Sequence, residues 1–100
     1  MIILKLTKKQ IERIPEIYSQ DGKENPTVQL HFFNILGRGD WYVLEGRPLE
    51  DGDWYFFGYV KSPLGEDCDE YGYFTLNQLK EAVFIELDKY FEPTPLQEVK

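Results

Sequence analysis

Apolar residues recur at helical spacing in two stretches of the chain, one near each end. Near the N-terminus, isoleucines follow Thr7, which begins a capping-box pattern, so we predict a helix that starts there. Because Pro15 interrupts the pattern, this helix should kink or end near Ile14. In the second stretch, Thr75 is a candidate N-cap for LNQLKEAV at 76–83, whose apolar residues share one face.

Between these helices the pattern changes to the alternation of apolar and polar residues that is typical of strands. Four segments show this alternation: the segment from Thr27, Trp41 to Gly46, Trp54 to Lys61, and 71–74. A short run, VFIEL, could add a final strand. Turns with glycine and acidic loops separate the four segments, at 37–40, 47–53 and 62–70.

These elements predict one α+β domain over residues 1–100. The strands should form an antiparallel meander sheet of about four to five strands, with the N-terminal and C-terminal helices packed on one face. One hundred residues are close to the commonest domain size, so we expect no second domain. Residues 90–100 are predicted to be an extended tail, because Pro93 and Pro95 do not fit a helix interior or a central strand.

Aromatic residues occupy both faces of the predicted strands. Strict alternation places Trp41 with Glu45 on one face and Tyr42 with Leu44 on the other. Because helices can cover only one face, some aromatic side chains should remain exposed, with acidic residues of the strand ends and loops around them. The predicted partner-binding residues are Asp40, Trp41, Tyr42, Glu50, Asp51, Asp53, Tyr55, Glu66, Asp67 and Asp69.

The net charge of −7 comes from 18 acidic and 11 basic residues, and the acidic excess is largest between residues 24 and 75. Such a field repels phosphate backbones, so we expect no direct binding of nucleic acid unless a local basic patch overrides it. The N-terminal segment lacks the pattern of a signal peptide, and no apolar run is long enough to span a bilayer. These features, with Cys68 as the single cysteine, predict a cytoplasmic protein that does not insert into membranes.

Few residues indicate catalysis. His31 is the single histidine, and a half-buried or exposed strand histidine is the favoured interpretation. Glu45 and Glu70 adjoin strand aromatics, where a carboxyl group could act as a general acid, but a rim carboxylate paired with an arginine is favoured. GEDCDE at 65–70 supplies oxygen ligands without the spacing of an EF-hand, which favours a solvated loop. No phosphate-binding loop, nucleophile elbow or cysteine pair occurs, so we predict no cofactor and no metal.

Five motifs follow one another in the chain: HFF, WYVLEG, WYFFGYV, EYGYFTLNQL and ELDKYFEPTPL. Together they resemble a family of small proteins of unknown function found in bacteria, their plasmids and their phages. The resemblance runs from about Leu6 to Leu96 and implies a setting on a mobile genetic element without implying a mechanism. The matching positions are Phe32, Phe33, Trp41, Tyr42, Glu45, Phe56, Phe57, Gly58, Glu70, Gly72, Tyr73, Phe74, Leu76, Leu79, Phe91 and Pro93.

We therefore predict a non-enzymatic interaction protein of a mobile genetic element that binds a host protein. In the narrower form of this hypothesis, the acidic middle imitates a nucleic acid and inhibits a host defence nuclease, which would make it a protein of the anti-CRISPR or anti-restriction type. Two alternatives stay open. One is a small metal-dependent enzyme that uses Glu45, Glu70 and His31. The other is an accessory subunit of a larger complex, for which the tail from Glu92 would be the docking strand.

Overall fold

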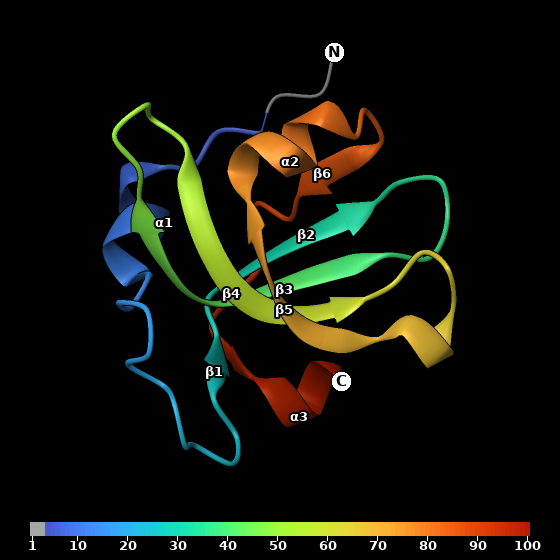
Figure 1. Ribbon diagram of the computed structural model, residues 1–100, viewed down its shortest axis with the longest axis horizontal. Coiled ribbons are helices and arrows are strands. Elements are labelled where there is room, and N and C mark those ends of the chain that lie inside the picture. Colours follow the sequence, from blue (N-terminus) through green and yellow to red (C-terminus); the bar gives the residue numbers. More distant parts are fainter. Residues whose placement is uncertain (1–3) are drawn as a thin grey trace.

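A five-stranded antiparallel sheet forms the centre of the protein in a computed structural model that describes residues 4–100 (Figure 1). The strand order is β5-β4-β3-β2-β6. The strands are β2 (Leu30–Asn34), β3 (Asp40–Pro48), β4 (Trp54–Lys61), β5 (Glu70–Thr75) and β6 (Ile85–Leu87). The first four form the predicted meander, and β6 returns to pair with β2 at the opposite edge from β5. The predicted α+β fold is confirmed.

Both predicted helices begin with a capping box. In each, the hydroxyl of a threonine accepts a hydrogen bond from a backbone N–H three residues later: Thr7 precedes α1 (Lys8–Arg13) and Thr75 precedes α2 (Leu76–Glu81). α1 ends before Pro15, as predicted, and α2 is shorter than predicted because the chain turns there toward β6. Within residues 4–100, no helix is long and apolar enough to cross a bilayer.

Residues 90–100 fold onto the sheet, which corrects the prediction of an extended tail. β7 (Thr94–Pro95) pairs with β1 (Thr27–Val28) in a separate two-stranded sheet, and α3 (Leu96–Val99) follows it. Leu96 is only 1% exposed, so the tail contributes to the hydrophobic core of the domain. The proline in β7 is compatible with this arrangement, because a short edge strand and the position before a helix need no N–H donor.

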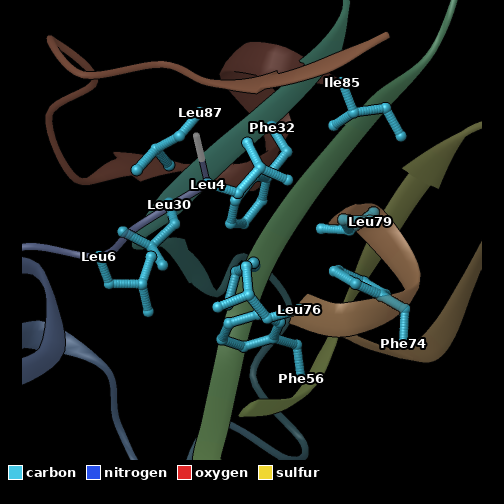
Figure 2. Close-up of a cluster of buried hydrophobic side chains, with 11 residues drawn as sticks. Leu4, Leu6, Leu30, Phe32, Phe56, Phe74, Leu76, Leu79, Ile85 and Leu87 are labelled. Atoms are coloured by element: carbon cyan, nitrogen blue, oxygen red, sulfur yellow. The ribbon is translucent and has the colours of Figure 1, made fainter. Parts of the chain in front are cut away.

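The two faces of the sheet have different covers (Figure 1). α1, α2 and the N-terminal segment lie on the first face, which carries the larger core (Figure 2). Its buried residues are Leu4, Leu6, Leu30, Phe32, Val43, Phe56, Phe74, Leu76, Leu79, Ile85 and Leu87. β1, β7 and α3 cover part of the second face, whose buried residues are Val28, Tyr42, Leu44 and Leu96. The prediction that helices pack on one face is therefore right for α1 and α2, whereas α3 lies on the other.

A β-bulge in β3 changes which side chains share a face. Val43 and Glu45 lie opposite consecutive residues of β4, so Leu44 is an extra residue in β3. Glu45 therefore lies on the second face with Leu44, whereas strict alternation predicts it on the first face. β3 and β4 approach so closely beside the bulge that a Cβ atom at position 58 would clash with the carbonyl oxygen of Tyr42, and this requires glycine there.

Candidate interaction surface

Aromatic side chains of β4 and β5 continue the second face of the sheet beyond its buried cluster. We call this surface the tyrosine face; it consists of Tyr55, Phe57, Tyr59, Tyr71 and Tyr73. Tyr71 and Tyr73 are 45% and 48% exposed, because β5 is the last strand of the sheet and the C-terminal tail contacts it only through the side chain of Lys100, which donates a hydrogen bond to the Tyr71 hydroxyl. The exposed rings therefore lie at the uncovered end of a face whose other end is closed.

The rings of the tyrosine face pack against one another across the two strands. Tyr55 and Tyr73 are stacked with centroids 5.2 Å apart, and Tyr59 and Tyr71 meet edge to face at 5.1 Å. The ammonium group of Lys100 lies 4.9 Å and 5.0 Å from the centroids of Tyr59 and Tyr71. Such cross-strand contacts fix the ring orientations, so little side-chain entropy remains to be lost when a partner binds.

A hollow of about 300 Å³ adjoins the tyrosine face, and we call it the tyrosine hollow. Its walls include Phe57, Tyr71 and Tyr73 from the sheet and Tyr18 from the loop after α1. Tyr18 is 69% exposed. The pKa of Tyr73 is raised, mainly by hydrogen bonding to the side chain of Tyr18 and then by burial.

Glu45 attaches the loop after α1 to the sheet. It is 3% exposed, and its two carboxylate oxygens accept hydrogen bonds from the backbone N–H groups of Tyr18 and Gln20 at 2.8 and 2.7 Å. Tyr18 has a positive φ of 73°, a conformation that costs a non-glycine residue about 1 kcal/mol or more. The carboxylate offsets that cost by bonding the N–H of the strained residue. These bonds assign Glu45 a structural role, which differs from both sequence-based interpretations.

His31 joins three segments on the second face. Its Nε2 lies 2.7 Å from a carboxylate oxygen of Asp40 in β3, and its Nδ1 lies 3.1 Å from one of Asp88, after β6. The ring stacks on Tyr42 with centroids 4.7 Å apart. Burial and then the charges of Asp40 and Asp88 raise the pKa of Tyr42 to about 12. His31 lies in a strand, as predicted, but only 15% of its side chain is exposed, so it is more buried than the predicted half-buried or exposed position.

The three residues of the enzyme hypothesis lie apart. Glu45 lines the tyrosine hollow, whereas His31 lines a different hollow, beside Gly39 and Asp88. Glu70 lies opposite Val60, whose side chain packs against the first core, so it belongs to the other face. Within residues 4–100, no three His, Cys, Asp or Glu side chains form a group that could hold a metal ion. The geometry therefore provides no shared site for Glu45, Glu70 and His31.

The acidic residues predicted to surround the aromatics are divided between two ends of the sheet. Glu50 and Asp51 lie in the loop between β3 and β4, and Glu66 and Asp67 lie in the turn between β4 and β5 at the opposite end (Figure 1). The length of β4, 8 residues, separates them by about 26 Å. Asp69 forms a two-pronged ion pair with Arg38 at 2.7 and 2.8 Å, and this hydrogen bonding lowers the pKa of Asp69.

Several other predicted partner-binding residues have internal contacts instead. Tyr42 is 6% exposed and Asp53 is 7% exposed, so their side chains are not available to a partner. Asp53 accepts hydrogen bonds from the backbone N–H groups of Trp54 and Asn77, both at 2.8 Å, and thereby connects the β3–β4 loop to α2. Asp40 is held by His31, and Trp41 packs partly buried against the first core.

Tyr55 is the predicted residue that the structure places on the tyrosine face. Sequence reasoning missed Tyr18, Tyr71 and Tyr73 as candidate site residues. The sequence does indicate Tyr71 and Tyr73, because tyrosines at alternate positions of an edge strand lie on the same side of the sheet and are exposed there.

Comparisons with models of known protein families, with curated proteins and with solved structures found no match to this chain. A function for this protein is therefore inferred from its fold and from the contacts of the second face.

Proposed function

We propose that this protein is a non-enzymatic interaction protein that binds another protein through the tyrosine face. The observation that carries the proposal is the group of mutually packed rings at the uncovered end of the second face. Tyrosine is enriched at interfaces because its ring contributes large apolar contact area and its hydroxyl group remains able to form hydrogen bonds. On a mobile genetic element, as the sequence resemblance implies, the partner would be a host protein.

Charges around the tyrosine face indicate the chemistry of the partner. The guanidinium group of Arg47 lies 5.5 Å from the centroid of Tyr55, and Lys100 lies over Tyr59 and Tyr71. Lys23 lines the tyrosine hollow together with two acidic residues, Asp21 and the buried Glu45. The rim that the sequence predicted to be acidic is therefore basic at these positions. A matching partner surface has an apolar centre with carboxylates at its edge.

An alanine substitution of both exposed rings tests the proposal. The tagged protein and its Tyr71→Ala/Tyr73→Ala variant would each capture partners from bacterial lysate, with Tyr90→Ala as the control. Tyr90 is 91% exposed and lies outside the tyrosine face, so its removal matches the loss of an exposed ring. We expect a stoichiometric partner that the double variant loses and the control retains. Equal capture by all three proteins would contradict the proposal, provided that circular dichroism shows each to be folded.

Nucleic-acid mimicry is a second candidate, supported by the net charge of −7 and by exposed carboxylates at both ends of the sheet. In this proposal Glu50, Asp51, Glu66 and Asp67 take the place of backbone phosphates in the channel of a host nuclease. Replacing these four residues by lysine should then abolish capture of the partner, whereas Tyr71→Ala/Tyr73→Ala should leave it intact. Capture that survives the charge reversal at both low and high salt would exclude mimicry.

A further inference from the structure

Basic side chains converge on a hollow of about 340 Å³ that the proposed function does not use. It lies between the N-terminal segment, α1 and the chain after β6. Four cationic side chains line it, and we call it the basic hollow: Lys5, Lys9, Arg13 and Lys89. Glu92 is the single acidic residue in its lining. More than a third of the 11 basic residues of an acidic chain therefore meet at one place.

The charges in the basic hollow lack internal partners. Within residues 4–100, ion pairs connect His31 and Arg38 to aspartates, and none involves the four cations of the hollow. Arg13 donates one hydrogen bond of 3.3 Å to the carbonyl oxygen of Gln29, and its buried Nε has no acceptor among the described residues. Four cations with a single carboxylate, that of Glu92, among them repel one another on balance, and an anion bound among them would relieve this repulsion.

An amide group adds a neutral donor to the same lining. Gln10 is 7% exposed, and its Oε1 accepts a hydrogen bond of 2.8 Å from the backbone N–H of Thr7. The Nε2 of Gln10 donates to no partner in the described part of the chain, and the capping box fixes the side chain at the wall of the hollow. Leu87 and Phe91 supply an apolar wall. The hollow thus combines positive charge, a fixed donor and apolar surface, as small-molecule sites do.

We propose that the basic hollow binds a small anion that carries two or more linked phosphate groups. Lysine ammonium groups bind phosphate as point charges, and a guanidinium group binds it through several N–H donors. The volume of about 340 Å³ lies at the lower end of the range for small-molecule sites. Inorganic pyrophosphate and a nucleoside triphosphate share the required chemistry. They differ in whether a base and a sugar contact the apolar wall.

A small ligand fits the electrostatics of this protein better than a nucleic acid does. At physiological salt, charges farther apart than about 8 Å are largely screened, so a ligand inside the hollow is governed by the four nearby cations. A nucleic-acid strand would continue beyond the hollow over the surface of a chain whose overall net charge is −7 and would be repelled there.

Calorimetric titration of the full chain with pyrophosphate and with ATP tests this proposal. We expect saturable binding at one site that weakens as salt is raised. Lys9→Gln and Lys89→Gln should each weaken it about tenfold, as the loss of one charge-assisted contact does. Lys8→Gln is the matched control, because Lys8 lies in the same helix but does not line the hollow, and it should change affinity less than about twofold.

The comparison of ligands completes the test. Tighter binding of ATP than of pyrophosphate would assign contacts to Leu87 and Phe91, and equal binding would assign recognition to the phosphates alone; both support the site. The proposal is overturned if neither probe binds saturably at millimolar concentration or if Lys8→Gln weakens binding as much as Lys9→Gln. A single-stranded oligonucleotide that binds more tightly than either probe would also overturn it. Tyr71→Ala/Tyr73→Ala should leave phosphate binding unchanged, so this test is independent of the tyrosine face.

Discussion

On the first face of the sheet Phe32 and Phe56 are fully buried, whereas on the second face Tyr71 and Tyr73 keep almost half of their surface exposed. The strands place an aromatic-rich set of side chains on both faces. The difference lies in what covers them: α2 and the N-terminal segment close the first face, and the C-terminal tail closes only the β1 side of the second. Whether an aromatic side chain of the sheet is buried therefore depends on the segments packed over it. The second face is only partly covered, and its exposed part remains available for binding.

This comparison predicts that the two faces differ in their contribution to stability. Phe56→Ala should lower the free energy of unfolding by about 3–5 kcal/mol, because it removes a fully buried ring from the larger core. Tyr73→Ala should lower it by about 1 kcal/mol or less, because its ring makes cross-strand contacts while half exposed. Urea denaturation measures both. Equal losses would show that the second face is also a structural core.

The covered part of the second face should respond as a core does. Leu96→Ala should cost about 2–4 kcal/mol, because Leu96 is 1% exposed and packs among residues of the second cluster. Leu64→Ala is the matched control, since Leu64 is 85% exposed, and should change stability by less than about 0.5 kcal/mol. Thermal and urea unfolding would compare them. A stable Leu96→Ala variant would instead favour a detachable tail, as the docking-strand hypothesis requires.

Removing a hydrogen bond between Glu45 and the loop after α1 should lower the free energy of unfolding by a smaller amount. Glu45→Gln should cost about 1–3 kcal/mol, because one carboxylate oxygen that accepts a backbone N–H is replaced by an amide donor. Hydrogen exchange at the amides of Tyr18 and Gln20 should become faster. Glu50→Gln, at an exposed position, is the control and should leave exchange at these two amides unchanged. Unchanged exchange in both variants would contradict the structural role of Glu45.

The ion pair at the end of the sheet should give the smallest effect. Because Arg38 lowers the pKa of Asp69, the pair stabilises the fold above the ordinary carboxyl value of 3.8, and this contribution is lost as pH falls through the lowered pKa. Asp69→Asn should therefore be less stable than the parent at pH 7, with the difference shrinking as the pH is lowered below 3.8. Asp67→Asn, in the same turn, should show no such trend in thermal unfolding. A stability difference that does not change with pH would contradict a contribution from the charge of Asp69.

Much of the fold could be predicted from the sequence because its signals are local. The capping threonines Thr7 and Thr75 bond N–H groups three residues away, and Pro15 ends α1 by steric contact with its own neighbours. The candidate site was harder to predict. The carboxylates of Asp40 and Asp88 meet His31 from residues 9 and 57 positions away, and no local pattern marks such a contact.

The sequence by itself determined the order of α1, the strands of the main sheet and α2, and the starts of both helices at their capping threonines, since these depend on neighbours within a few positions. Only the tertiary structure decided which aromatics stay exposed, because exposure depends on the tail that packs across the sheet. It also decided the face of Glu45 through the bulge at Leu44, and the gathering of Lys5, Arg13 and Lys89 in one hollow. Lys89 is far from Lys5 and Arg13 in the chain, and only the fold, which places the segment after β6 beside α1, brings the three side chains to one hollow.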